Sequence, residues 1–314
     1  MNKQFRKGFV LPIAASALIL VLGARVSGAQ DHVSFATPEE AVAALIAALQ
    51  KEDVAALGGL LGPGSEDILS SGDEVADATG RAGFVADYQE KHMLVAEDES
   101  TRILEVGPED WPLPIPIVAL DGKWRLDGAA GADEIVYRRI GRNELGAIAV
   151  SRGFIDAQFE YAAEGHDGND PGIFAAKIFS DPGLHNGLYW PTAEGEPPSP
   201  AGKAVARASA EGYKAVTGKR KPYHGYYYRM LFAQGAKAQG GAVEYFVDGV
   251  LAQGIALLAW PADYGASGIM SFMINQDGVV YQRDFGDETA MEVEKIQVFD
   301  PDSSWSIVES DEDG

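Results

Sequence analysis

Residues 138–162, RRIGRNELGAIAVSRGFIDAQFEYA, constrain the fold more than any other segment, because they have the pattern of one long helix with two apolar stripes. The first stripe contains large side chains, at Leu145, Ile148, Ile155 and Phe159. A neighbouring stripe contains small residues, at Gly146, Ala149, Gly153 and Ala157. On a helical period of 3.6 residues the two stripes lie roughly 100° apart. The pattern therefore predicts a helix that is enclosed on two sides and acts as a structural spine.

Arg138, Arg139 and Arg142 lie near the start of this helix, close to Glu144. The helix dipole disfavours cations at this end, so the arginines need carboxylate partners. Two interpretations are open: a site for a phosphate or carboxylate anion, or a salt-bridge cluster between two domains. The planar guanidinium group suits ion pairs at interfaces, which favours the second interpretation.

The first 29 residues have the three parts of a secretory signal peptide. A basic start is followed by an apolar run over residues 9–22 and by Ser27, Gly28 and Ala29, which precede the expected cleavage site. The apolar run is short for a membrane span of roughly 20 residues, which favours cleavage over retention as an anchor. We therefore expect a secreted or periplasmic protein with no membrane span after cleavage.

The charge and the cysteine count exclude several kinds of partner and site. The chain has a formal net charge of -22, and so acidic a protein is repelled by nucleic acid and by anionic lipid headgroups. The absence of cysteine excludes disulfides and thiolate metal sites, so buried apolar area has to hold the fold together. The histidines do not have the spacing of a zinc site.

The first predicted domain covers residues 30–132 and is a small α+β unit. Thr37 has the sequence context of a helix cap, and a second helix is expected from about Asp73. Strands follow, and Asp121 and Gly122 form a dipeptide that tolerates the positive φ angles of a tight hairpin turn. The predicted architecture is a pair of helices followed by an antiparallel meander.

The second predicted domain covers residues 133–308 and combines the long helix with an antiparallel sheet. A short helix is expected at residues 173–180. From Gly225 onward the chain consists of short apolar runs between glycine-bearing turns, which is typical of antiparallel strands. The acidic tail at 309–314 is expected to be disordered.

An acidic loop follows the long helix, and it is a candidate calcium site. Asp167, Asn169 and Asp170 carry oxygen atoms on nearly alternate residues, with glycine for the bend. A full ligand set is missing, so a plain solvated turn is the favoured alternative. Calcium is therefore the only cofactor that the sequence leaves open.

Aromatic residues are densest in PYHGYYYRML, residues 222–231. In a strand, alternate tyrosines of this segment share one face and would form a stacking platform for a glycan or a peptide. Core packing, with hydroxyl groups at the rim, is the favoured alternative. The candidate ligand-binding residues are Trp190, Tyr223, His224, Tyr226 and Tyr228.

The same segment contains the best candidate for chemistry. His224 with Glu144, or with an aspartate, could form an acid–base pair in a hydrolase, although no spacing requires it.

Ordered blocks along the chain resemble a known family. They include SSGD, WPLPIPIV, RRIGRNEL, GLYWP, PYHGYYYRML and LAWPADYGASGIMSFMINQDGVVYQRDFG, and they extend over almost all of residues 30–308. These blocks are similar to an uncharacterised bacterial family, domain of unknown function 2950, which implies no activity. The long helix and later strands also resemble pilin-like and pseudopilin-like soluble domains, and residues 30–132 resemble NTF2-like or cystatin-like folds. Fold likeness alone fixes no ligand.

Two functions are consistent with these features. The favoured hypothesis is a secreted or periplasmic non-enzymatic protein, which binds a glycan, a peptide or an envelope protein or has a structural role in the envelope. The alternative is a hydrolase that acts on an envelope polymer, with carboxylates or His224 as acid–base groups. A cleft with paired titratable groups would favour the enzyme, whereas an aromatic surface would favour binding.

Overall fold

The computed structural model describes residues 32–214 and 220–309. The signal peptide predicted at 1–29 lies outside the described residues, and so does the predicted tail apart from Glu309. Within the described part of the chain, no helix is long and apolar enough to cross a membrane.

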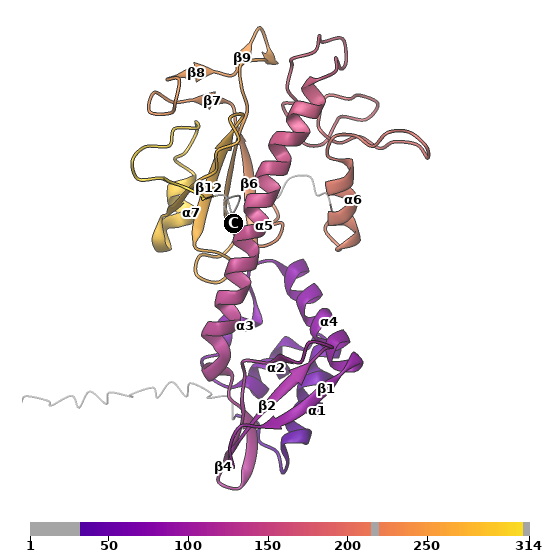
Figure 1. The fold of residues 1–314 in the computed structure, drawn as a ribbon, viewed down its shortest axis with the longest axis vertical. Coiled ribbons are helices and arrows are strands. Elements are labelled where there is room, and N and C mark those ends of the chain that lie inside the picture. The colour runs from indigo at the N-terminus through magenta and orange to yellow at the C-terminus, as the bar shows by residue number, and fades with distance from the viewer. Residues whose placement is uncertain (1–31, 215–219, 310–314) are drawn as a thin grey trace, which may run out of the picture. The chain divides into compact units, whose positions relative to one another are not determined.

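Helices and antiparallel sheets are both present, so the predicted α+β class is confirmed (Figure 1). The α-helices are α1 (Pro38–Gln50), α2 (Val54–Leu61), α3 (Glu66–Leu69), α4 (Glu74–Glu90), α5 (Gly128–Ala162), α6 (Gly202–Ala210) and α7 (Thr289–Val293). A 3₁₀ helix, η1, spans Gly286–Glu288 and leads into α7.

Two five-stranded antiparallel sheets contain most of the strands. The first has the order β1-β2-β4-β5 with β3 on β2, and consists of β1 (His92–Ala96), β2 (Thr101–Val106), β3 (Trp111–Pro112), β4 (Ile117–Leu120) and β5 (Lys123–Leu126). The second has the order β14-β13-β12-β11-β6, and consists of β6 (Tyr226–Leu231), β11 (Ala256–Pro261), β12 (Met270–Asn275), β13 (Tyr281–Asp284) and β14 (Ser306–Ile307). Two short hairpins pair β7 (Ala233–Gln234) with β8 (Val243–Glu244) and β9 (Phe246–Val247) with β10 (Val250–Leu251).

The first sheet and α1 enclose the first hydrophobic core. Thr37 caps α1 by accepting a hydrogen bond from the backbone N–H of Glu40 at 3.3 Å, as predicted. Asp121 and Gly122 have φ angles of 52° and 76°, which form the tight turn between β4 and β5. The core residues of this region come mainly from α1, α2 and the sheet, and are Ala41, Val42, Leu45, Ile46, Leu57, Leu60, Leu104, Ile117 and Leu126.

The second sheet forms the second core around its strand β11. Every residue of β11 is buried. Successive side chains of a strand point to opposite faces, so complete burial requires cover on both faces of the sheet. Both α5 and α7 pack on β11.

Helix α5 contributes to both cores. Its first turn is capped by Asp127, and Gly131 lies so close to the segment between β3 and β4 that a Cβ atom would come 2.6 Å from the Pro114 carbonyl oxygen. Ile135 packs on the first core, whereas Phe154 belongs to the second. The domain boundary predicted between residues 132 and 133 falls inside this helix, and the division into two domains stays a prediction.

The predicted enclosure of α5 on two sides is wrong. Leu145 is 68% exposed and Phe159 is 48% exposed, and Ala149 and Gly153 also face solvent. Many of the buried positions lie three or four residues apart on one face: Val136, Ile140, Asn143, Ala147, Ser151, Phe154, Gln158 and Ala162. Ile155 and Ala157, one from each predicted stripe, are buried as well. Polar residues occupy part of this face, so a search for apolar stripes finds positions at its margins, of which Ile155 and Ala157 are buried whereas Leu145 and Phe159 are exposed.

The short helix predicted at residues 173–180 is absent, and this segment is extended instead. Gln158 on α5 binds the backbone of Ala175 twice, because its Nε2 donates to the carbonyl oxygen at 2.8 Å and its Oε1 accepts from the N–H at 2.9 Å. Phe174 forms a bridge to Leu251. These contacts use the backbone groups that a helix would need for itself.

Candidate functional site

The loop that follows α5 returns on itself and forms an aromatic cavity. Phe179 and Tyr189 form a parallel bridge, with the Ser180 N–H donating to the Tyr189 carbonyl oxygen at 2.8 Å. The Ser180 hydroxyl accepts from the Gly187 N–H at 3.0 Å and donates to the Gly187 carbonyl oxygen at 3.2 Å. These contacts fix the two ends of residues 179–189 beside each other.

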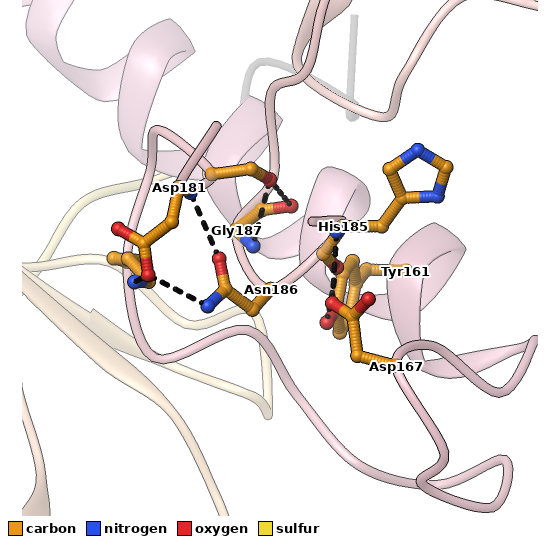
Figure 2. Close-up of polar contacts among 8 residues, drawn as sticks. Tyr161, Asp167, Asp181, His185, Asn186 and Gly187 are labelled. Atoms are coloured by element: carbon orange, nitrogen blue, oxygen red, sulfur yellow. Dashed lines mark hydrogen bonds and ion pairs between the residues drawn. The ribbon is translucent and has the colours of Figure 1, made fainter. Parts of the chain in front are cut away.

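A carboxylate and an amide close the tip of this loop. The Asp181 N–H donates to Asn186 Oδ1 at 3.0 Å, and Asn186 Nδ2 donates to Asp181 Oδ2 at 2.9 Å (Figure 2). Lys177 Nζ lies 2.5 Å from the same Oδ2 atom. Hydrogen bonds from Lys177 and Asn186 hold the pKa of the Asp181 carboxyl below its ordinary value. The negative charge of Asp181 is therefore balanced locally.

Two contacts hold the backbone of His185. The Asp167 carboxylate accepts from its N–H at 2.8 Å, and the Tyr161 hydroxyl donates to its carbonyl oxygen at 2.8 Å. Burial, followed by the charge of Asp167, raises the pKa of Tyr161 and keeps this hydroxyl a donor. Figure 2 shows the His185 ring pointing away from Asp167.

A series of aromatic rings leads from the buried end of α5 to the surface. Tyr161 stacks on His166 with ring centroids 4.2 Å apart, and His166 lies 5.4 Å from Trp190. Trp190 in turn stacks on the exposed His185 at 4.3 Å, with 16° between the ring planes. The buried Tyr161 therefore anchors a preformed aromatic surface.

Two of these rings, His185 and Trp190, line a cavity of about 520 Å³, which we call the aromatic groove. Phe179 lies edge-on to Tyr189 with ring centroids 5.7 Å apart, and it is 45% exposed. The groove is lined by Phe179, Ser180, Asp181, Pro182, Gly183, Leu184, His185, Tyr189, Trp190 and Pro191. Its volume lies within the range of small-molecule sites, roughly 300–1,000 Å³.

The candidate calcium residues have other partners or lie on the open turn. Asp167 binds the backbone of His185, and Asn169 closes the turn by donating its N–H to the His166 carbonyl oxygen at 3.0 Å. Asp170 is exposed. Among residues 32–214 and 220–309, no three His, Asp or Glu side chains are grouped so that they could hold a metal ion.

A second set of side chains surrounds His224, and we call it the closed cluster: Asp73, Glu211, Tyr213, His224 and Gly225. Asp73 caps α4 and is only 1% exposed, and its Oδ2 atom accepts from the Tyr213 hydroxyl and from the Gly225 N–H, both at 2.9 Å. The Tyr213 hydroxyl also accepts from the His224 N–H at 3.2 Å.

The imidazole of His224 pairs with a carboxylate that the sequence did not suggest. Its Nε2 atom lies 2.7 Å from Glu211 Oε2, and Tyr223 stacks on the ring at 4.1 Å. Glu144, the partner considered from the sequence, instead accepts the N–H groups of Ile269 and Met270 at the start of β12, both at 2.9 Å.

The other predicted ligand-binding tyrosines do not form a platform. Tyr226 is fully buried and its hydroxyl donates to the Met270 carbonyl oxygen at 2.9 Å. The Tyr228 hydroxyl lies 3.4 Å from the Tyr223 carbonyl oxygen, and burial raises its pKa. The core-packing interpretation therefore describes these two residues.

The arginines at the start of α5 are divided among different partners. Arg138 pairs with Glu134 on the same helix at 2.6 Å. Arg139 donates to the carbonyl oxygens of Asp67 at 2.5 Å and Ala266 at 2.8 Å. Arg142 is exposed. Arg138 and Arg139 therefore have different partners. Neither the anion-site hypothesis nor the salt-bridge hypothesis predicted this arrangement.

Of the candidates, the structure brings Tyr223 and His224 together and places Trp190 in the separate aromatic groove. Sequence reasoning missed Phe179, His185 and Tyr189 as groove residues and Glu211 and Tyr213 as neighbours of His224. The signal for the groove was the concentration of aromatic residues between 179 and 190, which the predicted helix at 173–180 obscured.

Comparison with protein families gives a match over most of the chain. The model of the family described as "Protein of unknown function (DUF2950)" matches residues 32–308, which include both cores, the aromatic groove and the closed cluster. No curated protein and no solved structure matches the chain, so the likeness of its parts to pilin-like, NTF2-like and cystatin-like folds stays a prediction. Over nearly its whole length, then, the chain belongs to the DUF2950 family.

Proposed function

We propose that this protein is a secreted or periplasmic binding protein that holds a small organic ligand in the aromatic groove and catalyses no reaction. The observation that carries the proposal is the cavity of about 520 Å³, with Phe179, Tyr189 and Trp190 in its wall. Small-molecule sites are typically preformed, apolar and aromatic, with a few polar groups for orientation. The signal-peptide pattern of residues 1–29 supports the location.

The polar groups of the groove favour binding over catalysis. Asp181 is its one carboxylate, and it is already paired with Lys177 and Asn186. The Ser180 hydroxyl is occupied by the backbone of Gly187 in both directions. General acid–base or nucleophilic catalysis needs a group that is free to exchange a proton with the substrate or to attack it. The His185 imidazole is the group in the groove that could do so, but its ring points away from Asp167, so that carboxylate does not orient it.

A thermal-shift screen tests the proposal, because any ligand of the native state raises the melting temperature. The screen would contain oligosaccharides, cell-wall fragments, short peptides, amines and calcium. We expect a ligand to raise the Tm of the wild type and of Tyr137→Ala, whose side chain is 67% exposed outside the groove. The same ligand should give a smaller shift with Phe179→Ala. An equal shift in Phe179→Ala would place the site elsewhere and contradict the proposal.

The closed cluster supports a second candidate, a hydrolase acting on an envelope polymer. The distance of 2.7 Å between His224 and Glu211 is that of a histidine oriented by a carboxylate. His224 has a φ angle of 51°, in the left-handed region that a residue with a Cβ rarely occupies. Such strain occurs at functional sites.

Polymer hydrolysis separates the two candidates. If the hydrolase proposal holds, the purified protein releases soluble fragments from cell-wall polymers, and His224→Gln lowers the rate by about 100-fold or more. If binding is the function, neither the wild type nor the variant releases fragments above the blank. If His224→Gln and Glu211→Gln both release fragments at the rate of the wild type, the closed cluster is not the site of hydrolysis.

A further inference from the structure

The charge of the aromatic groove differs from that of the chain as a whole. The chain has a net charge of -22, yet the one carboxylate that lines the groove, Asp181, is neutralised by Lys177 at 2.5 Å. Neither lysine nor arginine lines the cavity. A phosphate, sulfate or carboxylate ligand would find no cation there, so the groove fits a neutral ligand.

The apolar surfaces of the groove are flat and held at fixed angles. His185 and Trp190 are stacked with 16° between their planes, whereas Phe179 and Tyr189 stand at 78° to each other. The lining of the groove therefore contains one stacked pair of rings and one edge-on pair. A pyranose ring has a flat face of C–H bonds that packs on an aromatic face, and an edge of hydroxyl groups that faces away from it.

Polar atoms at the groove have no partner among the described residues. They are the Tyr189 hydroxyl, the Trp190 indole N–H and the His185 ring nitrogens, and they supply both donors and acceptors. Hydroxyl groups of a sugar also donate and accept, so each of these atoms would find a match.

The backbone of the groove, by contrast, offers little to an extended peptide. Three N–H groups donate to backbone carbonyl oxygens: that of Tyr189 to Ile178 at 2.7 Å, that of Leu188 to Lys177 at 3.1 Å, and that of Ser180 to Tyr189 at 2.8 Å. Peptides that add to a strand edge need free N–H and C=O groups. The three N–H groups named here are already paired and are not available to a peptide strand.

From these observations we infer that the ligand of the aromatic groove is a neutral saccharide, bound by stacking of a sugar ring on the aromatic side chains and by hydrogen bonds to Tyr189, Trp190 and His185. This inference depends on the proposed function, since it names the chemical class of the ligand at the same groove. One or two sugar units suit a cavity of about 520 Å³.

Calorimetric titration of the mature protein tests the inference with three probes: neutral gluco- and N-acetylglucosamine oligosaccharides, proline-rich peptides, and choline. We expect a neutral oligosaccharide to bind, with Phe179→Ala weakening it about tenfold and Tyr189→Phe about threefold. Tyr137→Ala, an exposed aromatic outside the groove, should leave the affinity unchanged. Raising the salt from 50 to 500 mM should change the affinity by less than about twofold, because neither the saccharide nor the lining of the groove carries an unbalanced charge.

Several results would overturn the saccharide assignment. Binding of choline or of a proline-rich peptide alone, weakened by Phe179→Ala, would keep the binding function and replace the ligand class. If a saccharide binds and Phe179→Ala does not weaken its affinity, the saccharide site lies outside the groove. Absence of heat with every oligosaccharide, while a different compound from the thermal-shift screen binds, would reject the saccharide and leave the binding function standing. Circular dichroism spectra equal to the wild type would show that the variants are folded.

Discussion

The aromatic groove and the closed cluster contain similar residue types in opposite arrangements. In the closed cluster, Asp73, Tyr213 and Gly225 satisfy one another, and the carboxylate is buried. In the groove, Phe179 is exposed and Trp190 keeps its indole N–H without a partner among the described residues. Groups that bind each other stabilise the fold, whereas groups left open are available to a ligand. The comparison predicts that substitutions in the two regions affect different measurements.

The largest expected effect is on stability, at Asp73. Replacement by alanine removes the acceptor of three hydrogen bonds, leaves the Tyr213 O–H and the Gly225 N–H without an acceptor, and should lower the free energy of unfolding by about 3 kcal/mol. Urea denaturation measures this quantity. Asp156→Ala, at an exposed position of α5, is the matched control and should change it by less than about 0.5 kcal/mol. Equal effects of the two substitutions would contradict the structural role of Asp73.

A smaller decrease in the free energy of unfolding is expected when Tyr213 is changed. Tyr213→Phe keeps the ring and removes the hydroxyl that joins Asp73 to the His224 backbone, which should cost about 1.5 kcal/mol of unfolding free energy. The combined variant with Asp73→Ala should lose less than the sum of the two single losses, because both remove the same hydrogen bond. Additive losses would show that the two side chains act independently.

Because of Tyr213, the free energy of unfolding is expected to fall at alkaline pH. Burial raises the pKa of Tyr213 above its ordinary value of 10.0, with a further contribution from Asp73, so the folded state keeps the phenol proton longer than the unfolded state does. This contribution is fully present below about pH 10 and is lost as the pH rises through the folded-state pKa. Urea midpoints measured between pH 9 and 11.5 should therefore fall less steeply in Tyr213→Phe than in the wild type. Parallel curves would argue against this coupling.

The smallest effect on stability is expected in the groove. Phe179→Ala removes a side chain that is 45% exposed, and should change the free energy of unfolding by less than about 1 kcal/mol. A loss as large as that of Asp73→Ala would mean that the groove is part of the core rather than a binding surface.

Local features of the fold were predictable from neighbouring residues. The cap at Thr37, the start of a helix near Asp73 and the turn at Asp121 and Gly122 depend on short-range hydrogen bonds and φ preferences, which a few residues determine. The long helix was also predictable, because its period extends over many turns.

The buried face of α5 and the conformation of residues 173–180 were not predictable, because long-range polar contacts decide them. Asn143 donates to the Ser267 carbonyl oxygen at 2.9 Å, and Gln158 binds Ala175. A hydrophobicity pattern predicts that such polar residues are exposed. In the fold they are buried, because each has a hydrogen-bond partner.

The candidate site was predictable only in part. Trp190 and His224 were recognised by residue type, but their partners come from contacts that residue spacing does not encode. Glu211 reaches His224 from the end of α6, and His185 is placed on Trp190 by backbone contacts with Tyr161 and Asp167.

The binding role of the groove is tested most directly by the indole N–H signals of the tryptophans in a ¹⁵N–¹H spectrum, each assigned through its Trp→Phe variant. A ligand found in the screen is added in increments. If the groove is the binding site, the signal of Trp190 moves most, and those of Trp260 and Trp305, which pack in the second core, move little. If the ligand moves Trp260 or Trp305 and leaves Trp190 unchanged, the groove is not where this protein binds it.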